Sequence, residues 1–203
     1  NDLISFKTKN KYLKQLKKKY NLRDYFIICD QFRKHKNHIV VLKALNYLKS
    51  KKKNFTVVCT GLFQDWRHKN HTLNLERYIN ENNLKNNFKI LGIVDEKDLK
   101  GLIKNSICLL KPSKFEGLSN SVVSARNLGT KVIMSNIPVH KEQKFENSYS
   151  FNVDDYKRLG QLMIEVSKNK KNRKNNRIKP NLDDKFIKDY IEMIKVSTSQ
   201  LNK

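Results

Sequence analysis

The chain has 203 residues with only six Gly and three Pro, which excludes a long low-complexity linker and suits one large domain. No apolar run reaches the length of a transmembrane helix, and the first residues do not resemble a signal peptide. Because the first residue is Asn and not Met, we expect either a fragment of a longer protein or a chain whose start was trimmed.

The net charge is +24, from 43 Lys and Arg against 19 Asp and Glu. One interpretation is a polyanionic partner, either nucleic acid or an anionic membrane surface. The other is a compositional drift towards Lys, Asn and Ile, as an AT-rich genome imposes. The lysines occur in most segments instead of one patch, which favours the second interpretation and still allows loose contact with anionic lipid.

Apolar strand-like runs alternate with runs of helical periodicity. The apolar runs do not alternate with polar residues, as is typical of strands buried on both faces of a parallel sheet. The sequence therefore predicts an α/β fold, a doubly wound, Rossmann-like parallel sheet. In chain order we expect strand 25–30, helix 37–52, strand 54–61, helix 73–84, strand 88–92, helix 95–106, strand 107–113, helix 119–129, strand 131–136, strand 149–151 and helix 154–169.

We expect a single domain over 1–203, with segments on either side of a core at 23–169. A basic helix at 8–22, within the leading segment 1–22, carries an apolar stripe. We favour the interpretation that this stripe packs on the sheet or on a domain missing from this chain. The alternative is that it lies on a membrane surface. A basic linker over 170–182 and a C-terminal helix over 183–203 follow the core.

The three cysteines, Cys29, Cys59 and Cys108, each lie within or at the end of an apolar run. Their odd number and the absence of a CxxC spacing argue against a zinc site or a disulfide framework. We expect buried, reduced thiols in a cytosolic protein.

Ligands of such sheets bind at the carboxyl ends of the strands, so the loop SKFEGLSNS after the strand 107–113 is a candidate site. A helix start presents free N–H groups, and Gly117 lets a ligand approach the backbone. The amides of 118–121 could hold a diphosphate. Glu116 either accepts hydrogen bonds from sugar hydroxyls or caps the following helix, and the residues alone favour neither.

Two further loops carry candidate residues. The loop CDQFRKHKNH, after strand 25–30, is either a second phosphate contact or a solvated basic turn, and its cationic or imidazole side chains are Arg33, Lys34, His35, Lys36 and His38. No third ligand lies near the two histidines, so we expect no metal site there. The loop IPVHKEQ contains His140 and Glu142, which either do acid–base work or are exposed and idle.

These loops resemble the C-terminal, donor-binding half of family 4 glycosyltransferases with the GT-B architecture. The resemblance runs from the helix at 8–22 to about Gln161. It is carried by LKPSKFEGLSNSVVSARNLGTKVIMSNIPVHKEQ and by DQFRKHKNH. It implies that the N-terminal acceptor domain is absent from this chain, that the helix 183–201 crosses back to that domain, and that the fragment alone transfers nothing.

The resemblance assigns a diphosphate grip and a catalytic acid. Lys36 matches the family lysine that holds the donor diphosphate, together with the backbone amides of Leu118, Ser119 and Asn120 at the helix start. Gln31 stands where many members have arginine, and Arg33 is a candidate substitute. Glu116 matches the acid that contacts the transferred sugar.

The resemblance also places the nucleotide. Ile93 and Val94 match the loop that lies against the base. Ser124 stands where the family has a second acid that binds the ribose, and a serine hydroxyl cannot accept from two ribose hydroxyls as a carboxylate does.

The implied activity is retaining transfer of a hexose from a nucleoside-diphosphate sugar to a glycan or lipid-linked acceptor in polysaccharide biosynthesis. The resemblance further implies a cytoplasmic protein that needs no metal or other cofactor. Such a protein can also associate with the periphery of a membrane. One alternative is a degenerate, non-catalytic member, which Gln31 and Ser124 favour. Another is a basic nucleic-acid-binding module, for which the sequence offers no aromatic stacking platform.

Overall fold

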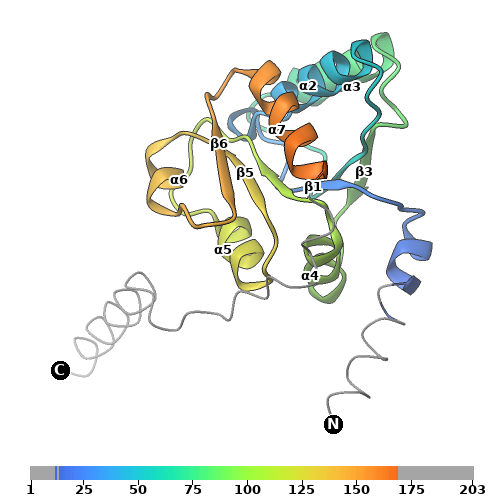
Figure 1. Cartoon of the computed structure of the whole chain (residues 1–203). Helices are drawn as coiled ribbons and strands as arrows, with labels where there is room; N and C mark the ends of the chain where they lie inside the picture. The colour runs from blue at the N-terminus through green and yellow to red at the C-terminus, as the bar shows by residue number, and fades with distance from the viewer. Residues whose placement is uncertain (1–11, 13, 169–203) are drawn as a thin grey trace, which may run out of the picture.

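The structure is a computed structural model that describes residues 12 and 14–168. Its centre is a six-stranded sheet in the order β3-β2-β1-β4-β5-β6, in which every neighbouring pair is parallel (Figure 1). This confirms the doubly wound, Rossmann-like α/β fold. The strands are β1 (Phe26–Cys29), β2 (Val57–Thr60), β3 (Phe88–Gly92), β4 (Leu109–Lys111), β5 (Val132–Ser135) and β6 (Ser148–Phe151).

Helices cover both faces of the sheet. Figure 1 shows α2, α3 and α7 on one face and α4 and α5 on the other. Each face has its own hydrophobic cluster, because the strands send alternate side chains to opposite sides. The helical elements are the 3₁₀ turn η1 (Lys34–Lys36) and the helices α2 (His38–Ser50), α3 (Asn70–Glu81), α4 (Glu96–Asn105), α5 (Asn120–Asn127), α6 (Pro138–Glu142) and α7 (Tyr156–Lys168).

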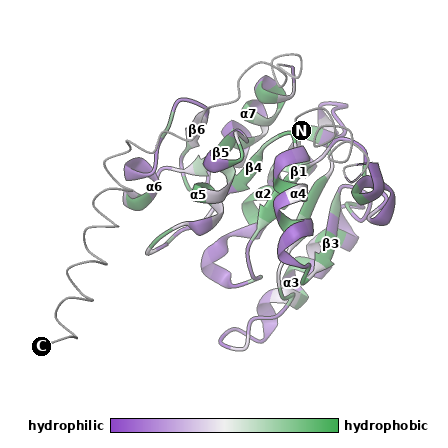
Figure 2. Ribbon diagram, turned by 90° about the horizontal axis from the view of Figure 1, so that it is seen from below, coloured by the Kyte–Doolittle hydropathy of each residue, from purple (hydrophilic) through white to green (hydrophobic). Residues whose placement is uncertain are grey.

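Local sequence explains where several helices begin and end. The carboxylate of Asp95 accepts from the amide of Asp98 at 2.8 Å and caps α4. Gly129 follows α5 with a φ of +67°, a conformation that favours glycine at a helix end. In Figure 2 the strands and the inward faces of the helices are hydrophobic, while the outward faces are hydrophilic, as amphipathic helices on a sheet require.

Three features differ from the expected elements. Helix α3 begins at Asn70, three residues before the expected 73. The sequence did not reveal this start, because the first turn is polar and carries no apolar period. Two short elements, η1 and α6, lie where only loops were expected. Pro138 in the first turn of α6 supplies the fixed φ that starts this five-residue helix.

The leading segment packs on α4. Residues 14–19 are helical, and Leu16 is 2% exposed. A Cβ added at Gly101 of α4 would lie 2.8 Å from the Cδ2 atom of Leu16, so the two segments touch closely. For the described part of the expected helix 8–22, this contact confirms packing as the role of the stripe. The expected linker 170–182 and C-terminal helix 183–203 lie outside the described residues.

Two further expectations concern the cysteines and membrane spans. All three cysteines are free thiols, with Cys59 and Cys108 buried and Cys29 half-buried. Burial raises the pKa of Cys29 to about 12. Among residues 12 and 14–168, no helix has both the length and the apolar character that crossing a membrane requires.

Candidate functional site

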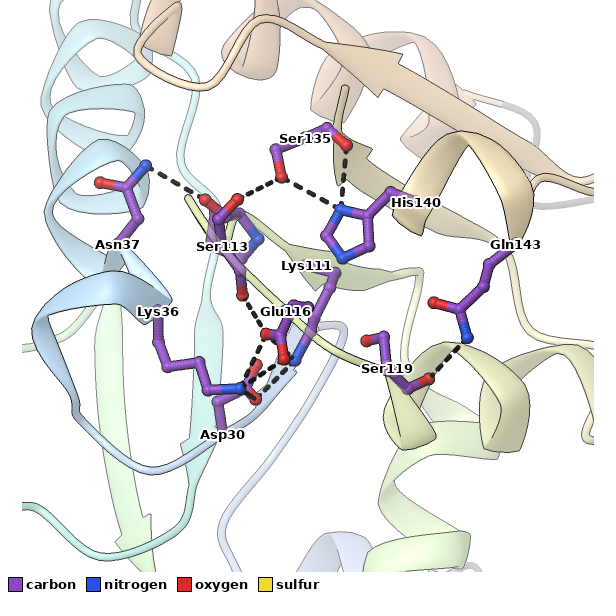
Figure 3. Close-up of polar contacts among 11 residues, drawn as sticks. Asp30, Lys36, Asn37, Lys111, Ser113, Glu116, Ser119, Ser135, His140 and Gln143 are labelled. Carbon is purple, nitrogen blue, oxygen red and sulfur yellow. Dashed lines mark hydrogen bonds and ion pairs between the residues drawn. The ribbon is translucent and has the colours of Figure 1, made fainter. Parts of the chain in front are cut away.

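The carboxyl ends of β1, β4 and β5 bring together side chains that lie far apart in the sequence (Figure 3). The chain runs outward from β1 to β3 and then returns to place β4 on the other side of β1. The loops after β1 and β4 therefore diverge at a topological switch point, where ligands of open α/β sheets bind. The loop after β1 carries η1, and the loop after β4 leads into α5.

Two lysines and two carboxylates form a compact cluster at this point, which we call the charged cluster: Asp30, Lys36, Lys111 and Glu116 (Figure 3). The Nζ atom of Lys36 lies 2.7 and 2.8 Å from the two carboxylate oxygens of Glu116. It also lies 3.2 Å from Oδ1 of Asp30. The Nζ atom of Lys111 donates to Asp30 at 2.6 Å and lies 2.9 Å from Oε1 of Glu116. The formal charges of the four groups cancel.

The cluster is largely withdrawn from solvent, which strengthens its electrostatic interactions. Burial acts to raise the pKa of Glu116, but the charge of Lys111 and hydrogen bonds from Lys36, Ser113 and Lys111 lower it to about 2. Burial acts to lower the pKa of Lys36, but Asp30 and Glu116 raise it overall. Both groups are therefore charged at neutral pH.

Glu116 does not act as a helix cap. Its carboxylate faces Lys36, Lys111 and Ser113, whose hydroxyl donates to Oε1 at 2.6 Å. The cap residue of α5 is Ser119, which makes no side-chain cap bond. Of the two interpretations of Glu116, the capping one is wrong, and the acid is held at the edge of the site instead.

The start of α5 carries no compensating negative charge. Its first turn contains no acidic residue. Leu118 and Asn120, at this helix start, are exposed to solvent. Ser119 is 1% exposed, and its Oγ atom has no hydrogen-bond partner among the described residues. An anion at this helix end would meet free N–H groups and the positive end of the helix dipole.

His140 is neither exposed nor paired with an exposed acid. It is 1% exposed in α6, whereas Glu142 is exposed. The Nδ1 atom of His140 lies 2.9 Å from the carbonyl oxygen of Ser135, which can only accept, so Nδ1 carries the proton. The imidazole is thus a fixed tautomer, and burial lowers its pKa. Glu142 is exposed, as one of the two interpretations expected, whereas the expectation of an exposed His140 is wrong.

The basic loop after β1 divides its side chains between several places. Lys36 enters the charged cluster, whereas Gln31 is exposed and accepts from the Nε atom of Arg33 at 3.0 Å. His38 is 0% exposed and stacks on Phe32 with ring centroids 4.2 Å apart, so its side chain belongs to the core and not to a phosphate site.

The remaining two basic residues of this loop, Lys34 and His35, line a cavity of about 500 Å³ with His68, His71 and Lys114. Burial lowers the pKa of His35 and of His71. Lys114 pairs with Asp154 at 2.9 Å, which offsets its charge. The cavity therefore lies beside the charged cluster without being lined by Lys36 or Glu116.

The residues expected at the nucleotide come from the loop after β3 and from helix α5. Ile93 follows β3 and is 78% exposed, whereas Val94 is partly buried against the cluster under α4 and α5. Ser124 is half-buried in α5. Gly92 ends β3 with a φ of +71°, which turns the chain at this point.

Three members of the site escaped sequence reasoning: Asp30, Lys111 and Ser113. The available signal was a lysine at the end of the otherwise apolar run ICLLKPS. A lysine that is 3% exposed in a parallel strand requires a buried counter-ion, so its position alone indicates a nearby acid.

Comparison with known protein families identifies the family of this chain. The family model described as glycosyl transferases group 1 matches residues 8–182. The chain belongs to this family. The comparison with curated proteins gives no match.

Several solved structures share this fold, and the matches cover less than half of each of their chains. A glycosyltransferase from Rickettsia africae is 20% identical with a TM-score of 0.66, and the match covers 78% of this chain and 42% of that one. Anabaena HepE, solved with UDP and glucose, is 16% identical with a TM-score of 0.68 over 79% and 43%. The sucrose-phosphate synthase of Thermosynechococcus elongatus is 15% identical with a TM-score of 0.71 over 92% and 48%. The chain therefore has the Rossmann-like fold of one half of a GT-B glycosyltransferase and spans less than half of each of these proteins.

Proposed function

We propose that this chain is the donor-binding domain of a retaining glycosyltransferase that moves a hexose from a nucleoside-diphosphate sugar to a glycan or lipid-linked acceptor in polysaccharide biosynthesis. The observation that carries the proposal is the direct contact of Lys36 with Glu116 beside the start of α5. A cation, a carboxylate and free backbone amides meet at the edge of the sheet where ligands bind.

The diphosphate would bind between Lys36 and the amides of Leu118, Ser119 and Asn120. The start of α5 offers N–H groups and a partial positive charge. Lys36 adds a full charge and up to three donors. In this proposal these groups neutralise the charge that develops on the departing nucleoside diphosphate, and no metal ion takes part.

The sugar would lie against Glu116. An ionised carboxylate only accepts hydrogen bonds, and the hydroxyls of a hexose are donors. The low pKa of Glu116 keeps this acid ionised throughout the physiological range. It can therefore orient the hexose while the bond from the anomeric carbon to the diphosphate breaks.

The nucleoside would lie on the side of the sheet that carries α4 and α5. The exposed side chain of Ile93 and the neighbouring Val94 would contact the base, and the Ser124 hydroxyl would bond one ribose hydroxyl. Among the solved relatives, Anabaena HepE was solved with UDP and with UDP-glucose, which supports a nucleotide-sugar donor for this chain as well.

The test is a titration of this chain with UDP, GDP and the corresponding nucleotide sugars. Binding is measured by calorimetry and by changes in the amide chemical shifts. We expect at least one nucleotide to shift the amides of 118–120 and the signals of Lys36. If none of the nucleotides, at millimolar concentration, produces heat or a change in chemical shift, donor binding is refuted. Because this chain spans less than half of each of the solved relatives described above, we expect binding without transfer.

A non-catalytic member is the second candidate, and Gln31 and Ser124 favour it because each lacks the charge that the family resemblance implies. A transfer assay on the full-length protein separates the two candidates. We further propose that the protein works in the cytoplasm and contacts anionic membranes loosely through its net charge of +24. Sedimentation with vesicles of anionic and neutral lipid would detect this contact.

A further inference from the structure

The two carboxylate oxygens of Glu116 have different environments. Oε1 receives three contacts: from Lys36 at 2.7 Å, from Lys111 at 2.9 Å and from the Ser113 hydroxyl at 2.6 Å. Oε2 accepts from Lys36 at 2.8 Å, and the structure gives it no other donor among the described residues. Removing Lys36 would therefore free Oε2 completely and leave Oε1 bound to two donors.

The two lysines of the charged cluster also differ. Lys111 ends β4, its side chain is 3% exposed, and its Nζ lies 2.6 Å from Asp30. Lys36 ends the short turn η1, its side chain is 16% exposed, and its contact with Asp30 is longer, at 3.2 Å. The side chain of Lys111 is thus held in place by two carboxylates, whereas Lys36 is the cation that can reach solvent.

We propose that Lys111 is a positioning residue that holds Glu116 in place, while Lys36 is an exchangeable cation that leaves Oε2 of Glu116 when a diphosphate arrives. This inference rests on the proposed function. Lys36 would trade a carboxylate partner for a phosphate one, and the vacated Oε2 would accept a hydroxyl of the sugar. Capture of the diphosphate and recognition of the sugar are then one coupled event.

Charge balance explains why Lys111 is needed. The cluster contains two positive and two negative groups. Once Lys36 turns to the phosphate, Asp30 and Glu116 would be two buried carboxylates facing each other. Such a pair takes up a proton unless a cation remains between them. Lys111 is that cation, and the low pKa of Glu116 agrees with its influence.

The first test follows the Glu116 carboxyl by NMR-detected titration without ligand. We expect Lys111→Met to raise the pKa of Glu116 by about one unit or more, more than Lys36→Met does, and Lys111→Arg to restore it. Lys114→Met, which removes a nearby lysine outside the cluster, should leave it unchanged. If Lys111→Met does not fold, the double variant Asp30→Asn/Lys111→Met removes the whole buried pair, and the pKa of Glu116 should then lie above its value in Asp30→Asn alone. An unaltered pKa in the folded variant would overturn the inference.

The second test adds inorganic pyrophosphate and follows the lysine side-chain signals. We expect the signals of Lys36 to move and those of Lys111 to stay. Movement of Lys111 with Lys36 unmoved would overturn the inference and leave the donor site standing. No movement of either lysine at saturating pyrophosphate would refute the diphosphate site itself, and with it the exchange, while the titration of Glu116 would still report whether Lys111 holds the acid.

Discussion

Tyr20 and Asp98 are 78 residues apart, yet the tyrosine hydroxyl donates to the carboxylate at 2.6 Å. Tyr12 and Lys19 donate to the same carboxylate, each at 2.6 Å. These three bonds, from Lys19, Tyr12 and Tyr20, lower the pKa of Asp98 to about 2. The leading segment is therefore held to α4 by an ionised acid as well as by the apolar contact of Leu16.

We expect Asp98→Asn to lower the free energy of unfolding at pH 7 by about 1–3 kcal/mol, the scale of hydrogen bonds to a charged group. Because the folded pKa is depressed, the stabilisation is present above the unfolded pKa near 4 and is lost as the pH falls towards 2. Urea unfolding at several pH values would show the wild type and the variant converging in acid. Glu96→Gln, at an exposed residue of the same helix, should change little, and equal losses in the two variants would contradict the prediction.

Lys36→Ala should weaken diphosphate binding by about 1–3 kcal/mol, because it removes a charged donor from the proposed site. Calorimetry with inorganic pyrophosphate at fixed ionic strength measures the effect. Lys100→Ala removes the same charge from an exposed position on α4 and serves as the control. An affinity unaltered by Lys36→Ala would remove this lysine from the site.

Ser124→Glu should tighten nucleotide binding, because a carboxylate accepts from two ribose hydroxyls where the serine hydroxyl serves one. The expected gain is about 1–2 kcal/mol, again the scale of a charged hydrogen bond. The measurement is the affinity for UDP and GDP. Asn127→Glu adds the same charge at an exposed residue of α5. If that control tightens binding equally, the gain comes from overall charge and not from the ribose.

Gly61→Ala should destabilise the fold, whereas Gly117→Ala should leave the fold stable and affect only ligand binding. Gly61 has a φ of +110°, and an added Cβ would lie 2.5 Å from the carbonyl oxygen of Asp30, so we expect a loss of about 2–4 kcal/mol of stability. A Cβ at Gly117 meets nothing within 4 Å, so that variant should fold normally. If the diphosphate approaches the backbone there, Gly117→Ala will weaken pyrophosphate binding at unchanged thermal stability. Normal binding by the folded variant would place the ligand elsewhere.

His38→Leu should make the protein less sensitive to acid. Burial lowers the pKa of His38 to about 3, so the unfolded chain takes up a proton near pH 6.5 that the folded chain refuses. Stability contributed by the neutral imidazole is therefore present above pH 6.5 and lost as the pH falls towards 3, by up to about 1.4 kcal/mol per pH unit. Urea unfolding between pH 7 and pH 4.5 tests this slope. His68→Leu, at an exposed histidine, is the matched control, and equal slopes in both variants would count against the prediction.

The order of strands and helices could be predicted because each strand is a continuous apolar run and each long helix has a clear period. Helix α6 could not, since five residues hold too few apolar positions to show a period. The start of α3 was missed for a similar reason. The polar turn at Asn70 is helical because of its place in the fold and not because of its own pattern.

The site was predictable where a loop contains its own signal, as in the run from Ser113 to Ser121. The resemblance assigned Lys36 to the diphosphate and Glu116 to the sugar, and the structure brings the two side chains into direct contact. The roles assigned to these residues stay predictions. Lys111 was missed because its function depends on two acids, Asp30 and Glu116, of which the first is 81 residues away. The core position of His38 was missed because its neighbours in sequence are basic and polar.

Lys36 and Glu116 are 80 positions apart in the sequence, and this separation has a consequence for synthesis of the protein. During translation the first half of the sheet, β1 to β3, emerges before β4, the strand that pairs with the free edge of β1. A nascent chain therefore exposes one flank of β1 until β4 is complete, and contacts between such distant segments form slowly. Nucleotide added to stalled ribosomes should bind only when the chain has grown past α5, so the growing polypeptide acquires its ligand at a defined length.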